Sequence, residues 1–134
     1  MIPTSLREIA AAVDGRLLAV PEPELMASHV CSDTREVEQG SLFVALEGSR
    51  VDGHDFAADA VSAGAVAVLG ARTTGVPTIV VVDVLAALGR LARFHIDRLA
   101  GTTVIAITGS MGKTTAKDLT ASVLETEGPT ISPP

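Results

Sequence analysis

The residues best suited to chemistry form one short loop, Thr108-Gly109-Ser110-Met111-Gly112-Lys113-Thr114-Thr115. Glycines let a backbone wrap closely around phosphate groups, and the start of a following helix directs N–H groups toward negative charge. In such a loop Lys113 reaches the β- and γ-phosphates of a nucleotide, and Thr114 places its hydroxyl on Mg²⁺. The pattern therefore predicts ATP binding by residues 109–115, with Lys113 as a catalytic residue and Thr114 as a metal contact.

This loop departs from the strict G-x-x-x-x-G-K-[ST] pattern, because the position five before Gly112 is Ile107. The alternative interpretation is a glycine-rich turn followed by an incidental Lys-Thr-Thr. The flanking residues favour phosphate binding, since residues 103–108 predict a strand and residues 114–127 predict a helix. We expect Leu119 and Val123 to mark the packed face of that helix.

Helices that would position these residues begin at recognisable capping residues. Ser5 and Glu8 have the spacing of a capping box, which predicts a helix starting at residue 6. Asp55 is expected to cap a helix that ends at Gly64, and Asp83 to cap a longer one. The longer helix is predicted to pack through Leu85, Leu88, Ala92 and Ile96.

Apolar runs between these helices predict strands at residues 16–20, 42–46, 65–69 and 78–82. Residues 28–32 alternate too weakly to predict a strand. Strands that alternate with helices indicate an α/β fold with a largely parallel or mixed sheet.

Composition narrows the function classes. The chain has 134 residues, of which 47% are hydrophobic and 19% charged. A net charge of -6 and an aromatic content of 2% argue against a nucleic-acid-binding surface. The single cysteine, Cys31, is expected to be a small core residue. With neither a signal peptide nor a membrane-spanning segment in the sequence, we expect a cytoplasmic protein without membrane insertion.

The end of the sequence shapes the predicted domain organisation. A strand–loop–helix unit normally continues through a right-handed crossover into a second parallel strand, yet the chain stops at Pro134. We expect an N-terminal piece of a longer protein, with one domain at residues 1–100 and the truncated start of an ATP-binding domain at 101–134. The alternative is a nucleotide-binding or regulatory module without catalysis.

Several blocks in a fixed order resemble the Mur ligase family of peptidoglycan synthesis. They are Ser32-Asp33-Thr34-Arg35, the segment 40–48, Asp52-Gly53-His54-Asp55-Phe56, Ala60, Gly64-Ala65 and the loop at 108–115. The resemblance covers most of the chain and is far more specific than the loop alone. Met111 departs from the family, which usually has Asn, Ser or Thr at that position.

The resemblance implies a three-domain ligase that uses ATP and Mg²⁺. Its N-terminal domain would be a small α/β domain that holds the uridine end of UDP-N-acetylmuramoyl-tripeptide, followed by a parallel-sheet ATP-binding domain. The terminal carboxylate of the peptide would become an acyl phosphate, and the amine of D-alanyl-D-alanine would attack it. Lys117 and Asp33-Thr34-Arg35 favour this branch over the branch that adds the third amino acid. The protein is expected to be a monomer.

Candidate substrate-binding residues follow from the same resemblance. Asp33, Thr34 and Arg35 are expected to contact the UDP moiety, since a guanidinium matches a diphosphate through its planar fork. The equally weighted alternative is an Asp–Arg pair that holds a loop on the sheet. Asp52 and His54 are candidates for the same site, although a turn in which they satisfy backbone groups is the stronger alternative. The spacing of the three histidines predicts no metal site.

Overall fold

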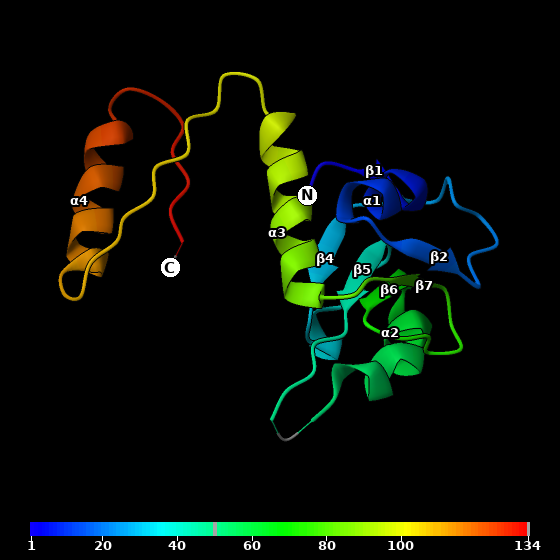
Figure 1. Ribbon diagram of the computed structural model, residues 1–134. Coiled ribbons are helices and arrows are strands. Elements are labelled where there is room, and N and C mark those ends of the chain that lie inside the picture. The colour runs from blue at the N-terminus through cyan, green and yellow to red at the C-terminus, as the bar shows by residue number, and fades with distance from the viewer. Residues whose placement is uncertain (50, 134) are drawn as a thin grey trace. The chain divides into compact units, whose positions relative to one another are not determined.

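The computed structural model describes residues 1–49 and 51–133, and the chain divides into two compact units, Met1–Ala100 and Gly101–Pro134. The first unit combines helices and strands around one main sheet (Figure 1). This arrangement confirms the predicted α/β class.

The main sheet of the first unit has five strands in the order β2-β7-β6-β5-β4. Their bounds are Arg16–Leu18 for β2, His29–Cys31 for β4, Ser41–Val44 for β5, Ala65–Gly70 for β6 and Thr78–Val80 for β7. Strands β4 to β7 run parallel, and β2 joins the edge antiparallel to β7, so the sheet is mixed. The carboxyl ends of the four parallel strands therefore meet at one edge.

Two short strands, β1 (Thr4–Ser5) and β3 (Met26–Ala27), form a separate antiparallel pair. The sequence did not predict β1, β3 or β4, because these strands of two or three residues do not lie within a longer apolar run, as the equally short β2 and β7 do. Pairing with a neighbouring strand, and not local preference, determines such segments.

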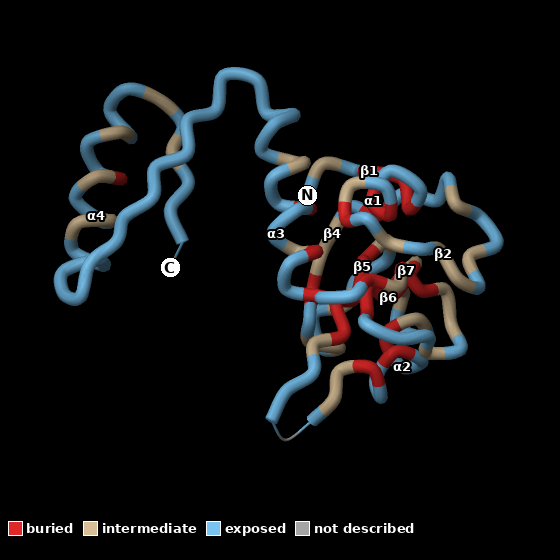
Figure 2. The backbone as a smooth tube through the Cα atoms, viewed as in Figure 1, coloured by how far each residue is buried: buried red, intermediate tan, exposed pale blue. Residues whose placement is uncertain are grey.

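Helices cover both faces of the main sheet. Side chains alternate along β5, so that Leu42 and Val44 face α1 (Leu6–Val13) and α3 (Val84–Asp97). Phe43 and Cys31 lie on the opposite face, with α2 (Ala57–Ala63). Figure 2 shows the buried residues gathered along these strands and on the inner sides of the helices. The burial of Cys31 agrees with its expected place in the core.

The helix caps agree with the sequence at two of three positions. Ser5 and Glu8 form the predicted capping box of α1, and the Asp83 carboxylate accepts from the Ala86 N–H to cap α3. The prediction for Asp55 is wrong, because a 3₁₀ turn, η2 (Gly53–Phe56), precedes α2, and Asp52 caps that turn. The residue that caps the entry to this segment is therefore Asp52, three residues before the predicted Asp55.

The packed face of α3 agrees with the prediction only at Leu88, which is partly buried against the core. Its buried residues are Val84, Ala87 and Leu91, whereas Leu85 is 69% exposed. Both stripes have the helical period, so periodicity alone does not choose between them. The observed face places the small Ala87, which is fully buried, within the core cluster that α3 shares with α1.

The second unit contains one helix, α4 (Lys113–Leu124), and forms no strand at residues 103–108. A strand needs a hydrogen-bonded neighbour, and no described residue of this unit pairs with that segment. Leu119 and Val123 are 64% and 66% exposed, so the predicted packed face of α4 is wrong for the described structure. Across the described residues, no helix is long and apolar enough to cross a membrane.

Candidate functional site

A pocket of about 370 Å³ lies in the first unit where β4 and β5 end. Polar residues that follow β4 form part of its lining, and apolar residues from β5 onward form the rest. The lining residues are Ser32, Asp33, Thr34, Phe43, Leu46, Val51, Gly53 and Phe56. Ligands of open α/β sheets characteristically bind beyond the carboxyl ends of the strands. A larger hollow along Glu22–Met26 contains none of the predicted site residues.

Asp33 and Thr34 enter this pocket from η1 (Thr34–Glu36), a 3₁₀ turn that follows β4. Asp33 caps the turn by accepting from the Arg35 N–H at 2.9 Å, and it also accepts from Arg35 Nε at 3.0 Å. These hydrogen bonds from Arg35 lower the pKa of Asp33 to about 2. The Arg35 side chain is 87% exposed, so the ion pair leaves its guanidinium open to an anion. Both interpretations of this block therefore fit the geometry.

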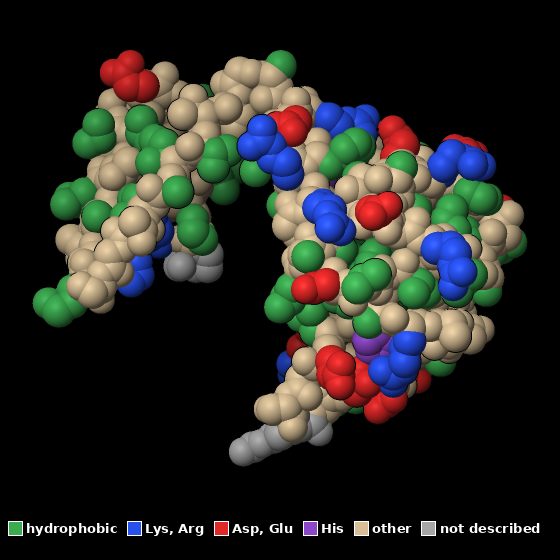
Figure 3. Space-filling model, in the orientation of Figure 1, with side chains coloured by type: hydrophobic (Ala, Val, Ile, Leu, Met, Phe, Trp, Pro, Cys, Tyr) green, Lys and Arg blue, Asp and Glu red, His purple; other side chains and the backbone are tan. Residues whose placement is uncertain are grey.

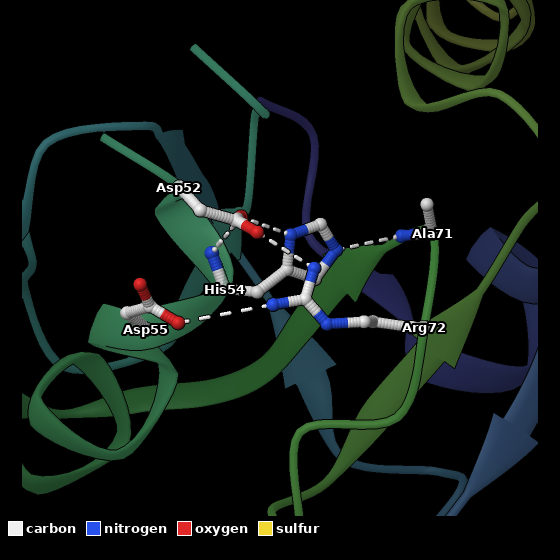
Figure 4. A network of polar contacts seen from close by, with 5 residues as sticks. All are labelled: Asp52, His54, Asp55, Ala71 and Arg72. Atoms are coloured by element: carbon white, nitrogen blue, oxygen red, sulfur yellow. Dashed lines mark hydrogen bonds and ion pairs between the residues drawn. The ribbon is translucent and has the colours of Figure 1, made fainter. Parts of the chain in front are cut away.

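Asp52 and His54 form a polar network with residues at the end of β6 (Figure 4). His54 Nδ1 lies 2.6 Å from Asp52 Oδ1, and His54 Nε2 accepts from the Ala71 N–H at 2.9 Å. The His54 side chain is 2% exposed, and both of its ring nitrogens have partners within the chain. This geometry favours the alternative in which the histidine satisfies loop and strand groups.

Arg72 belongs to the same network, although the sequence analysis did not single it out. Its guanidinium donates to Asp52 Oδ2 at 2.7 Å and lies 3.7 Å from Asp55 Oδ1. The available signal was its position two residues after the end of β6, in the loop at the carboxyl edge of the sheet. Figure 3 shows acidic and basic side chains side by side at the lower end of this unit, beside a histidine.

The Asp52 carboxylate is the centre of this network. Its pKa is lowered, first by the hydrogen bond from the His54 N–H and then by those from the Arg72 and His54 side chains. One oxygen receives the backbone N–H and the ring of His54, while the other receives Arg72. An ionised Asp52 therefore joins three groups from two segments of the chain.

The predicted phosphate-binding residues are consecutive in the loop and the first turn of α4. Gly109 and Gly112 have φ angles of 156° and 77°, in the region that favours glycine. Gly112 is the N-cap of α4 and supplies no side-chain acceptor. The first N–H groups of the helix are therefore free to donate to a ligand. The Lys113 ammonium donates to the Gly109 carbonyl. These backbone donors and this cation suit a phosphate chain, and the Thr114 hydroxyl suits a bound Mg²⁺.

Comparison with protein families matches residues 27–95 to the Mur ligase family, catalytic domain. The chain is 41% identical to a UDP-N-acetylmuramoyl-tripeptide--D-alanyl-D-alanine ligase from Mycobacterium leprae. That alignment covers 100% of this chain and 32% of the relative. The chain thus spans about a third of the length of this relative.

Solved structures give a similar result. A MurF structure from Acinetobacter baumannii has a TM-score of 0.84 and 32% identity, and the match covers 92% of this chain and 28% of the other. A MurF ligase from Thermotoga maritima, solved in complex with ADP, has a TM-score of 0.69 and 35% identity, with coverage of 75% and 24%. In both matches, this chain corresponds to about a quarter of the compared chain.

Proposed function

Because this chain belongs to the Mur ligase family, we propose that it is part of an ATP-dependent ligase that adds D-alanyl-D-alanine to UDP-N-acetylmuramoyl-tripeptide. The observation that carries the proposal is the 41% identity, over 100% of this chain, to a relative with that name. The buried, unpaired Cys31 fits a reducing compartment, and we place the activity in the cytoplasm of a monomeric enzyme.

The first unit, residues 1–100, is proposed to bind the UDP end of the substrate in the pocket beyond β4 and β5. Leu46, Val51 and Phe56 give this pocket an apolar side that suits the flat face of a base. Asp33 and Thr34 supply polar groups on the other side for its hydrogen-bonding edge. Arg35 is exposed beside them and is suited to the diphosphate.

The second unit, residues 101–134, is proposed to begin the ATP-binding domain. Backbone donors of residues 109–115 would hold the phosphates, Lys113 would balance the charge that develops on the γ-phosphate, and Thr114 would contact Mg²⁺. Transfer of that phosphate to the terminal carboxylate of the tripeptide leaves ADP and an acyl phosphate. Attack by the amine of D-alanyl-D-alanine then forms the amide bond and releases phosphate.

Phosphate release tests the proposed reaction in the ligase that contains this chain. We expect release only when ATP, magnesium, UDP-N-acetylmuramoyl-tripeptide and D-alanyl-D-alanine are all present. Release with UDP-N-acetylmuramoyl-dipeptide and a single amino acid, but not with this set, would replace the proposal with the branch that adds the third residue.

Calorimetry with UDP tests the proposed substrate pocket in the 134-residue chain itself. Thr34→Val keeps the size of the side chain but removes a hydroxyl at the pocket, and we expect it to weaken UDP binding. Ser62→Ala removes a hydroxyl that bonds within α2, and as a matched control it should leave UDP binding unchanged. Equal affinities for all three proteins would exclude Thr34 as a contact.

A further inference from the structure

His54 is a buried polar side chain for which the proposed substrate contacts leave no role. Its side chain is 2% exposed, and it belongs to the turn, η2, that contributes Gly53 and Phe56 to the pocket. A side chain that is closed to solvent and hydrogen-bonded at both nitrogens has no free group for a substrate. His54 can therefore affect substrate binding only by positioning its hydrogen-bond partners, Asp52 and Ala71.

Hydrogen bonding determines which protons the His54 ring carries. The Ala71 N–H can only donate, so His54 Nε2 must present a lone pair to it across 2.9 Å. The Asp52 carboxylate is an acceptor, so Nδ1 must carry the proton that lies between them across 2.6 Å. The ring is consequently neutral and is held in the Nδ1–H tautomer.

These two hydrogen bonds join segments that are distant in the sequence. Asp52 and Gly53 belong to the turn that follows β5, whereas Ala71 directly follows β6. Glycines allow close approach at two points around this turn, one against the ring and one against the Leu46 backbone. A Cβ on Gly70 would lie 2.8 Å from His54 Nε2, and a Cβ on Gly53 would lie 2.8 Å from the Leu46 backbone. The ring therefore lies against the end of β6, while Gly53 of the same turn lies against the Leu46 backbone.

We infer that His54 is a positioning residue, which fixes the Gly53 wall of the substrate pocket by linking the Asp52 turn to Ala71 at the end of β6. The inference rests on the proposed UDP-binding function of the pocket and adds to it a residue that does not touch the substrate. Arg72 reinforces the link from the same end of β6, because it holds the second oxygen of Asp52. The turn and the strand end are thus joined at two points.

Three substitutions distinguish the hydrogen bond to Asp52 from the hydrogen bond to Ala71. His54→Gln can still accept from the Ala71 N–H but loses the donor to Asp52. His54→Asn can still donate to Asp52 but no longer reaches Ala71, and His54→Phe loses both bonds while keeping a planar ring. His29→Gln is the matched control, because His29 forms one side-chain hydrogen bond among the described residues, with Ser41, and lies at the amino end of β4.

Calorimetry with UDP on the 134-residue chain gives the first readout. If the connection to Ala71 positions the wall, His54→Phe and His54→Asn should each raise the dissociation constant for UDP about tenfold, as expected for a displaced contact surface. His54→Gln should lie closer to the unsubstituted chain, and His29→Gln should match it. Folded His54→Phe and His54→Asn variants that bind UDP with unchanged affinity would overturn the inference.

Nitrogen NMR of the His54 ring and amide exchange give readouts that need no ligand. We expect the Nδ1–H tautomer in the folded chain, and faster amide exchange at Gly53 in His54→Asn than in the unsubstituted chain. An Nε2–H ring, a charged ring, or unchanged exchange at Gly53 would contradict the inference, even if His54→Phe fails to fold. If the unsubstituted chain does not bind UDP, the proposed function fails, and Gly53 exchange alone then decides whether His54 holds the wall.

Discussion

In Met1–Ala100, the charged side chains at and near the pocket are paired within the chain, Asp33 with Arg35 and Asp52 with His54 and Arg72. In Gly101–Pro134, the loop residues lie exposed beside largely uncovered apolar side chains. In the first unit, Phe43, Leu42 and Leu69 are at most 1% exposed. In the second, Ile105, Met111 and Leu119 are 51%, 89% and 64% exposed, and Figure 2 shows most of this unit in the colour of exposed residues.

This difference separates two ways of building a site. A pocket made from side chains depends on the packing that fixes each rotamer, so it requires a complete core around it. A phosphate loop depends mainly on backbone N–H groups at a helix start, and a short local segment can present those groups. Substitutions should therefore affect the two units through different properties: stability in the first and ligand contacts in the second.

The largest expected difference comes from the same substitution in each unit. Leu69→Ala removes a fully buried side chain and should lower the free energy of unfolding by about 2–5 kcal/mol. Leu119→Ala trims a side chain that is 64% exposed on α4, and should change it by less than about 0.5 kcal/mol. Urea unfolding followed by circular dichroism measures both. If Leu119→Ala lowered the free energy of unfolding as much as Leu69→Ala, the two units would not differ in packing as proposed.

Lys113→Ala tests whether the second unit acts through a ligand contact. Loss of its charge-assisted hydrogen bonds to the phosphates should lower turnover of the ligase that contains this chain by about ten- to a hundredfold. UDP binding to the 134-residue chain should stay unchanged, because the proposed UDP pocket belongs to the other unit. Lys117→Ala is the control, since Lys117 bonds Pro133 and Asp118 outside the loop. Unchanged turnover in Lys113→Ala would exclude Lys113 from the mechanism.

His95 is an exception to the pairing in the first unit, and it should make that unit sensitive to acid. Neither of its ring nitrogens has a hydrogen-bond partner among the described residues, and burial, followed by the N-terminus and Arg98, lowers its pKa. The unfolded chain therefore takes up a proton near pH 6.5 before the folded chain does, so stability should fall as the pH drops below about 6.5.

Thermal unfolding between pH 7 and pH 5 measures this sensitivity. His95→Leu should flatten the pH dependence, whereas the lowered pKa of Asp33 acts only between about pH 4 and pH 2, outside this range. An unchanged slope in His95→Leu would assign the acid sensitivity to another group.

The smallest expected effects come from two backbone positions with positive φ. Ala19 has a φ of 53° in the first unit, so Ala19→Gly should raise the free energy of unfolding by about 0.5 kcal/mol. Gly112 has a φ of 77° with open space around its Cβ position, so Gly112→Ala should weaken ATP binding by strain alone, about fivefold. Denaturant unfolding and ATP titration measure the pair. A destabilised Ala19→Gly would show that chain entropy outweighs the relief of strain there.

The sequence predicted the parts of the fold that depend on local preferences. The Ser5 cap, the Asp83 cap and the strand at β6 all carry their signals within a few residues. The buried face of α3 and the missing strand at residues 103–108 depend on what lies alongside, which a local pattern does not contain. For the same reason, the local pattern predicted Asp55 as a cap, whereas Asp52 caps the turn that precedes α2.

The candidate site was predictable in its residue types but not in its contacts. The blocks at 33–35 and 52–54 were singled out by their resemblance to the family, and in the structure they follow β4 and β5, whose carboxyl ends meet at one edge of the sheet. Nothing near His54 in the sequence indicates that Ala71 is its partner, since that hydrogen bond spans 17 residues. Whether a polar residue contacts a ligand or holds the fold is decided by such distant contacts. The substrate contacts of Asp33, Thr34 and Arg35 stay predictions.

The rate at which Cys31 is alkylated reports how often the edge of the sheet opens. The thiolate is the form that reacts with alkylating reagents, and burial raises the pKa of this thiol, the only one in the chain. While β4 remains paired with β5, alkylation should be slow, and its rate should follow the frequency with which this edge strand detaches. A ligand bound where β4 ends would lower the alkylation rate of Cys31 without contacting the sulfur.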